Sequence, residues 1–151
     1  MKNNIENGIY IPDENRELYP LDEWMKRKDP TTAQTVVLVT DSGMLEIAKE
    51  DLPSEFNFED AQKAAAEYRE GFRCATRHEA IEMYDARFRG LDEAFKKIGG
   101  KLAINIYWTS EVSPNPEHNS NRAFLYSGYA CLVGNDYKYN TGAVRPVFLH
   151  A

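Results

Sequence analysis

Histidine and cysteine, the side chains that most often bind transition metals, are scarce in this sequence. Among 151 residues there are three histidines and two cysteines. There is no HExxH or CxxC motif and no pair of histidines at helical spacing, so no zinc site is indicated. Cys74 and Cys131 are too few for a disulfide framework. We expect two buried free thiols, with a single bridge as the alternative if the fold brings them together. No metal or cofactor is predicted.

The sequence also has no excess of positive charge and no long apolar run. Eighteen Lys and Arg face 24 Asp and Glu, giving a net charge of −6 and a pI near 5.1. No basic stripe offsets this acidity, which excludes a nucleic-acid partner. Apolar runs are short, such as "VVLV" at 36–39, whereas a membrane helix needs about 20 residues. The start of the sequence has no apolar signal-peptide core. We therefore expect no membrane insertion and synthesis in a cytoplasm.

Catalytic groupings are weak as well. His78, His118 and His150 stand apart in the sequence. Cys74 lies four residues before His78, but a shared helix face does not make a nucleophile–base pair. The acidic residues at 79, 82 and 85 are better explained as the solvated face of a helix near its N-terminus. Because no acid, base and nucleophile can be placed together, the protein is predicted not to be an enzyme.

The first part of the chain, residues 1–55, reads as β structure. "GIYI" at 8–11 predicts a short strand. "TVVLV" and the alternating "MLEIAK" flank the turn residues Asp41, Ser42 and Gly43, which predicts a β-hairpin.

The middle part, residues 56–100, predicts two or three helices. Asn57 is a candidate N-cap, and Thr76 followed by Glu79 fits a capping box. The second helix places Ala80, Ile81, Tyr84 and Phe88 on one face. A third, short helix precedes Gly99-Gly100.

In the last part, residues 101–151, strands return. We expect them at 102–108, 122–133 and 143–149, separated by turn-rich segments 113–121 and 134–142. With helices segregated from a mostly antiparallel sheet, the chain is predicted to be α+β. No repeat or long linker appears, so residues 1–151 are expected to form one domain.

This last part combines aromatic side chains with Asn, Ser and Gly, the composition of a recognition surface. It also suits sugar rings, which have apolar faces and polar hydroxyls. Some of the aromatic residues must be core, and Phe124 and Leu132 are assigned there, with Trp108 at the edge of the core. The two turn-rich segments are expected to meet at one edge of the sheet. The predicted ligand-binding residues are Asn119, Asn121, Tyr126, Tyr137, Tyr139 and Asn140.

Several short segments resemble a known family. "GFRCATRHEAIEMY", then "GG" and "YWTSE", then "NSNRAFLY" and "NDYKYNTGAVRPV" are similar to a pattern with an RLPT-type helix start, YWSSTE, an asparagine-rich aromatic strand and a closing VRPV. That pattern belongs to the DUF1566 (Lcl C-terminal) proteins, whose C-type-lectin-like fold is shared with formylglycine-generating enzymes and phage tropism determinants. "GIYIPDENRELYPLDEW" and "VVLVTD" resemble the leader of such proteins in gut Bacteroidetes and their phages.

The chain also departs from this pattern. Cys74-Ala75 replaces Leu-Pro, and Thr109 replaces a serine. No cysteine pair matches the active site of formylglycine-generating enzymes, so their activity is not carried over. The calcium-binding triplets of animal C-type lectins are also missing, and calcium-dependent sugar binding is not carried over either.

The resemblance implies a C-type-lectin-like fold, with two or three helices packed on a small twisted sheet. It further implies a non-enzymatic binding or display protein on the virion surface of a bacteriophage, as a fibre, tail or capsid decoration. The host would be a gut bacterium such as Bacteroides, with assembly in its cytoplasm. Expected partners are a bacterial surface glycan or protein receptor, other virion proteins, and further copies of the chain, for example in a trimer. The alternative is a structural joint whose aromatic C-terminal face is an oligomer interface.

Overall fold

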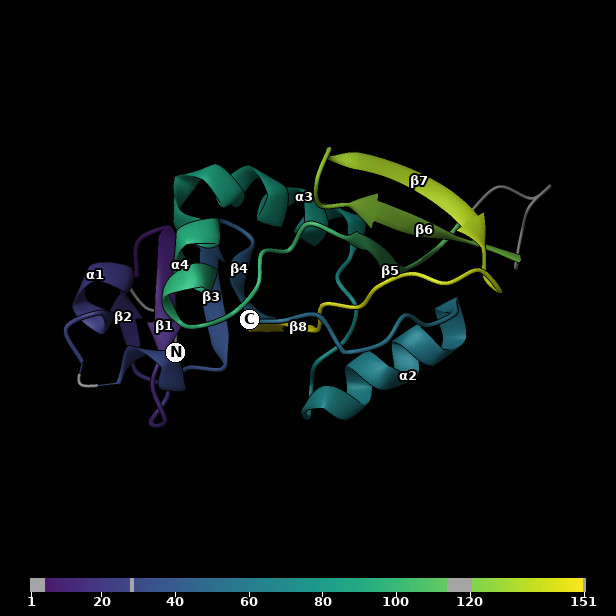
Figure 1. Ribbon diagram of the computed structural model, residues 1–151. Coiled ribbons are helices and arrows are strands. Elements are labelled where there is room, and N and C mark those ends of the chain that lie inside the picture. The colour runs from purple at the N-terminus through teal and green to yellow at the C-terminus, as the bar shows by residue number, and fades with distance from the viewer. Residues whose placement is uncertain (1–4, 28, 114–120, 151) are drawn as a thin grey trace.

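Two antiparallel sheets and a set of helices make up the part of the chain that the computed structural model describes, residues 5–27, 29–113 and 121–150 (Figure 1). The strands are β1 (Gly8–Pro12), β2 (Leu18–Pro20), β3 (Thr35–Thr40), β4 (Gly43–Ala48), β5 (Ile106–Val112), β6 (Arg122–Ser127), β7 (Leu132–Tyr137) and β8 (Val147–His150). The helices are α1 (Leu21–Trp24), α2 (Phe58–Tyr68), α3 (Arg77–Ala86) and α4 (Asp92–Lys97), with a 3-10 turn η1 (Pro30–Thr32) and a π-type turn η2 (Arg87–Leu91). The α+β prediction is confirmed, but the strands form two sheets, not one.

The larger sheet has the order β2-β1-β3-β4-β8. Its centre is the predicted hairpin, with Thr40 opposite Gly43 across the two-residue turn of Asp41 and Ser42. Gly43 has φ +133°, a backbone conformation that side chains disfavour. The edge strand β8 comes from the end of the chain, so the first and last parts share this sheet.

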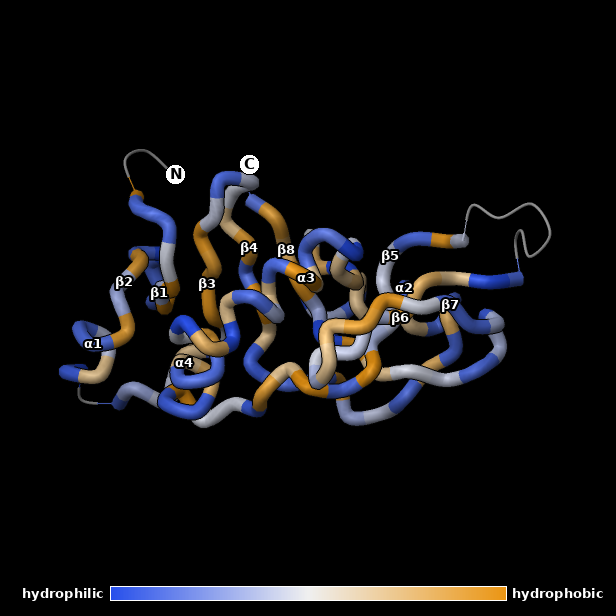
Figure 2. Tube along the Cα trace, turned by 90° about the horizontal axis from the view of Figure 1, so that it is seen from above, coloured by the Kyte–Doolittle hydropathy of each residue, from blue (hydrophilic) through white to orange (hydrophobic). Residues whose placement is uncertain are grey.

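The helices α3 and α4 cover one face of this sheet and form the main core with it. Figure 2 shows the hydrophobic stretches of β3, β4 and β8 lying side by side. The fully buried side chains of this core come from all three parts of the sequence, among them Ile11, Val36, Ile47, Leu91, Phe95, Ile98 and Val147.

Both predicted helix caps are confirmed. The side chain of Asn57 accepts a hydrogen bond from the backbone N–H of Asp60, at 2.9 Å. Thr76 and Glu79 form the reciprocal capping box at the start of α3, with hydrogen bonds of 3.1 and 2.9 Å.

The predicted apolar face of α3 is only partly correct. Ala80, Met83 and Ala86 are buried, but Ile81 is 37% exposed and Phe88, in η2, is 72% exposed. Small alanine side chains let the helix approach the sheets closely, which turns the larger Ile81 and Phe88 away.

The smaller sheet has the order β5-β6-β7 and lies between α2 and α3 (Figure 1). On the α2 side, Phe58, Ala61 and Ala65 pack with Trp108, which is 1% exposed. On the α3 side, Tyr107 and Tyr126 join the main core. Trp108 therefore belongs to the core, as expected.

The single strand predicted over 122–133 is wrong, because the chain reverses at 128–131 into the β6–β7 hairpin. A Cβ on Gly128 would clash with the carbonyl oxygen of Ala103, so only glycine allows this close approach. Cys131 has φ 54° in the same turn. Residues 134–137, predicted as loop, instead lie in β7. Leu132, assigned to the core, is 67% exposed, because β7 is an edge strand, and Phe124 is half-buried.

Both cysteines are free thiols, Cys74 buried and Cys131 partly buried. The alternative of a bridge between them is therefore wrong. No helix within the described residues is long and apolar enough to cross a membrane.

Candidate functional site

The end of β7 carries a stacked pair of tyrosines. The rings of Tyr137 and Tyr139 have centroids 5.2 Å apart and planes within 9° of parallel. β7 ends at Tyr137, and the chain turns at residues 138–139, where the N–H of Asn140 donates to the Tyr137 carbonyl at 3.0 Å. This turn brings the two rings together. Tyr137 is 40% exposed and Tyr139 is 72% exposed. We call this pair the tyrosine platform.

Contacts with Arg122 hold Tyr137, one of the two platform residues, in place. The guanidinium of Arg122 lies 4.3 Å from the centroid of the Tyr137 ring, and its Nη1 donates to the side-chain oxygen of Asn135 at 2.7 Å. Arg122 stands directly opposite Tyr137 in the β6–β7 register. A cation, Tyr137 and Tyr139 therefore lie next to one another, an arrangement worth about 0.5–1 kcal/mol for the cation–π contact at an exposed site.

The turn after β7 is closed by one carboxylate. Oδ1 of Asp136 accepts hydrogen bonds of 2.7 Å from the backbone N–H of Tyr137 and from Nδ2 of Asn140. This local bonding is typical of Asp and Asn in turns. It fixes Asn140 beside the platform before any ligand arrives.

A hollow of about 290 Å³ lies next to the platform, lined by Asn57, Glu59, Asn121, Lys138 and Tyr139. It is formed where the N-terminus of α2 meets the segment after β7. Two backbone hydrogen bonds join these pieces: Phe58 N–H donates to the Lys138 carbonyl at 2.9 Å, and Lys138 N–H donates to the Asn121 carbonyl at 2.8 Å. The hollow thus offers an aromatic ring, two amides, a carboxylate and an ammonium within one small space.

The structure brings together only some of the predicted ligand-binding residues. Tyr137, Tyr139, Asn121 and Asn140 are all exposed at this end of the smaller sheet. Tyr126 is 3% exposed, because its side chain points from β6 into the core under α3. Assigning it to the ligand surface was wrong, and burial raises the pKa of its hydroxyl. Asn119 lies outside the described residues.

Three lining residues, Asn57, Glu59 and Lys138, were missed by the sequence analysis. Asn57 was recognised only as a helix cap, which it is. Nothing in the local sequence indicates that the start of α2 lies beside residues 121 and 138. Tertiary packing alone places these segments together.

One Ser–His–acid grouping exists elsewhere, and its geometry does not suit nucleophilic catalysis. Ser42 Oγ lies 3.4 Å from Nε2 of His78, and Oε2 of Glu82 lies 3.6 Å from the same nitrogen. A catalytic acid orients the histidine through its other nitrogen. Within residues 5–27, 29–113 and 121–150, no group of three His, Cys, Asp or Glu side chains is arranged to hold a metal ion.

Comparisons with known proteins find similarity at the level of structure only. No family model matches the sequence, and no curated protein matches it either. The crystal structure of botrocetin, a C-type-lectin-like protein, is similar with a TM-score of 0.46 and 11% sequence identity, over 76% of this chain and 96% of that chain. At this TM-score and identity, the similarity carries no conclusion about the fold family or the function of this chain.

Proposed function

We propose that this protein is a non-enzymatic binding domain that holds a sugar unit of a surface glycan against Tyr139. The observation that supports this is the tyrosine platform beside the polar hollow. A sugar ring has an apolar face that packs on an aromatic ring and hydroxyls that bond to amides and carboxylates. The 290 Å³ hollow is close to the lower end of the size range of small-molecule sites, which is about 300 Å³.

The platform is pre-organised for such a ligand. Tyr137 is held between Arg122 and Tyr139, and Asp136 ties down the turn. Ordering a loop and its side chains on binding costs about 0.5–1.5 kcal/mol for each immobilised side chain. A site already ordered in the free protein avoids much of that cost.

A binding screen with matched variants tests this proposal. The purified protein is applied to an array of bacterial surface glycans, and affinities for the hits are measured by calorimetry. Tyr139→Ala and Tyr137→Ala should weaken binding at least tenfold, because binding energy concentrates in a few aromatic contacts of on the order of 2 kcal/mol.

The matched control is Tyr129→Ala. Tyr129 is 75% exposed, at the other end of the β6–β7 hairpin. The Tyr129→Ala variant should bind the glycans with the affinity of the wild type. Equal loss in all three variants, or unchanged binding in the platform variants, would reject the site.

The narrower role that we propose is receptor recognition by a bacteriophage virion protein. It rests on the sequence resemblance to phage tropism determinants and on an exposed platform suited to contact with a cell surface. Electron microscopy of purified virions with a labelled antibody tests it. If virions from a host that expresses the protein carry no bound antibody, this role is contradicted.

A structural joint is the second candidate, and one observation favours it. Among the described strands, β7 pairs only with β6, so its outer edge is open. Leu132 and Val133 on this strand are 67% and 39% exposed, and an open edge with apolar side chains is a template for pairing with another chain. Size-exclusion chromatography with light scattering separates the two candidates. A stable trimer that dissociates on Tyr137→Ala and Tyr139→Ala would favour the joint.

A further inference from the structure

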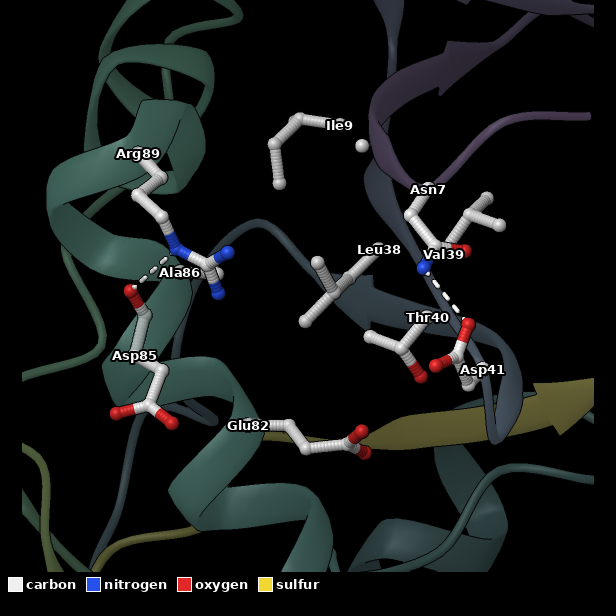
Figure 3. A pocket seen from close by; sticks show the side chains of 11 residues that line it. Asn7, Ile9, Leu38, Val39, Thr40, Asp41, Glu82, Asp85, Ala86 and Arg89 are labelled. Carbon is white, nitrogen blue, oxygen red and sulfur yellow. Dashed lines mark hydrogen bonds between the residues drawn. The ribbon is translucent and has the colours of Figure 1, made fainter.

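A second cavity lies between α3 and the larger sheet (Figure 3). None of the residues that line it belongs to the tyrosine platform. Its volume is about 460 Å³, within the range of small-molecule sites. β1 and β3 form one wall, and α3 with η2 forms the other. We propose that this cleft binds a small zwitterion with an apolar side group, such as a short peptide with free ends.

The floor of the cleft is apolar. It is made by Ile9, Leu38 and Ala86, which all pack against the main core, and of these Leu38 and Ala86 are at most 4% exposed. These side chains already belong to the packed cores of the larger sheet, so the floor is rigid. An aliphatic group of a ligand would lose its water against this surface and gain about 25 cal/mol for each Å² buried.

Carboxylates stand on one side of the cleft. Glu82 extends from α3 toward Thr40 and Asp41 at the end of β3 (Figure 3). Asp41 is held by Asn7, whose Nδ2 donates to Oδ1 at 2.9 Å. Glu82 is weakly engaged at its outer side, with Ser42 Oγ at 3.4 Å and His78 Nε2 at 3.6 Å. An ammonium group placed between Glu82 and Asp41 would meet two acceptors.

A guanidinium stands on the other side, on the same helical segment as Asp85, whose carboxylate also belongs to the lining but points away from the apolar floor in Figure 3. Arg89 lies where the helix is interrupted, with φ −114° and ψ 22°, followed by Gly90 at φ 120°. Interruptions of this π type occur frequently at functional sites. Nε of Arg89 donates to the carbonyl of Asp85 at 3.1 Å, and this hydrogen bond orients the guanidinium. In Figure 3 the guanidinium points from the helix toward Leu38, over the apolar floor.

These opposite charges select the class of ligand. A neutral sugar bound here would remove water from Arg89 and Glu82 without giving either group an opposite charge. Burying polar groups without hydrogen-bond partners is unfavourable. An anion would satisfy Arg89 but meet Glu82 and Asp41. A molecule with one ammonium, one carboxylate and an aliphatic side chain satisfies both ends and the floor. Arg89 can accept the carboxylate with two parallel hydrogen bonds.

Three forms of one dipeptide provide the probe: Leu-Leu with free ends, N-acetyl-Leu-Leu, and Leu-Leu amide. Binding to the full chain is measured by calorimetry and by changes in the amide NMR spectrum. The free dipeptide should bind the wild type, and blocking either end should weaken binding at least tenfold. The shifted signals should include Ile9, Leu38 and Ala86. Equal binding of the three forms, or no binding at millimolar concentration, overturns the proposal.

Two variants assign the ends of the ligand. Arg89→Gln should bind the free and amidated peptides equally, because the carboxylate has lost its partner. Glu82→Gln combined with Asp41→Asn, which removes both carboxylates that face the ammonium, should bind the free and acetylated peptides equally. Glu67→Gln and Arg69→Gln, which change exposed charges on and just after α2, should behave like the wild type. If they lose binding as well, the effect is general electrostatics and the site is wrong.

This cleft and the tyrosine platform are tested separately. Tyr139→Ala should leave dipeptide binding unchanged, and Arg89→Gln should leave glycan binding unchanged. Failure at one site therefore does not decide the other. Circular dichroism melts of each variant verify that the fold is kept.

Discussion

Arg145 and Asp51 form an ion pair in the core, in which Nε of Arg145 donates to Oδ1 of Asp51 at 2.8 Å. The arginine side chain is 2% exposed and the aspartate 18%. The same guanidinium donates, at 2.8–2.9 Å, to the carbonyls of Ala48, Lys101 and Leu102. One side chain near the end of the sequence therefore joins the end of β4 to the segment after α4.

Replacing Arg145 by methionine should strongly destabilise the protein. The change removes the cation from Asp51, which keeps hydrogen bonds only from the neutral donors Tyr107 and Asn105, and it takes the same donor from three carbonyls. Breaking a buried ion pair on one side costs about 3–5 kcal/mol. Urea unfolding followed by circular dichroism measures the loss. Arg69→Met, at an exposed position, serves as the control and should change stability by less than about 0.5 kcal/mol. Equal effects of the two changes would contradict the structural role of Arg145.

Stability should fall in acid partly through Glu46. This carboxylate is 2% exposed and accepts hydrogen bonds from Arg16, Thr35 and His150. Burial alone would raise its pKa, but the hydrogen bonds outweigh burial and hold the pKa of Glu46 below its ordinary value of 4.5. The unfolded chain keeps the ordinary pKa, so this stabilisation is present above about pH 4.5 and is lost as pH falls through the lower, folded pKa.

The Glu46→Gln variant should therefore lose less stability than the wild type between about pH 6 and pH 3. Urea unfolding at a series of pH values measures this difference. Glu67→Gln, an exposed glutamate on α2, is the control and should keep the wild-type pH dependence. If the two variants respond to pH alike, Glu46 is not the group responsible.

Trp108 and Tyr139 should separate stability from binding. Trp108 is 1% exposed, donates from Nε1 to the Phe56 carbonyl at 2.8 Å, and packs edge-on against Phe58 at 5.5 Å. Trp108→Ala should lower stability by about 3–5 kcal/mol, as large core truncations do. Tyr139→Ala should leave the melting temperature nearly unchanged, because its ring is mostly in solvent. Calorimetry measures the melting temperature of each variant. If Tyr139→Ala unfolds the protein and Trp108→Ala does not, the assignment of Trp108 to the core and of Tyr139 to the binding surface is wrong.

The two cysteines should differ in reactivity. Burial raises the pKa of the Cys74 thiol to about 12, so almost none of it is thiolate at neutral pH, and the thiolate is the reactive form. Cys131 is partly exposed in the β6–β7 turn. Iodoacetamide under native conditions should label Cys131 alone, and both thiols should react in urea. Peptide mass spectrometry reads out the positions, and native labelling of Cys74 would contradict its burial.

Some of the structure could be predicted because it depends on neighbouring residues. The Asn57 cap, the Thr76–Glu79 capping box and the Asp41-Ser42 turn each involve residues within four positions, so local patterns indicate them. The β6–β7 turn was missed for a physical reason. Gly128 is required there by the nearby carbonyl of Ala103, a contact that no local pattern shows.

By itself, then, the sequence determined the helix caps, the β3–β4 hairpin, the α+β class and the exposure of Tyr137 and Tyr139. Only the tertiary structure decided that Tyr126 is core, that Leu132 lies on an open edge, and that Asn57 and Lys138 line the same hollow. The physical reason is that burial depends on which distant segments pack together. The pairing of β4 with β8 and the hydrogen bonds of Arg145 join the first, middle and last parts of the sequence. The hollow itself forms because the start of α2 packs against the segment after β7.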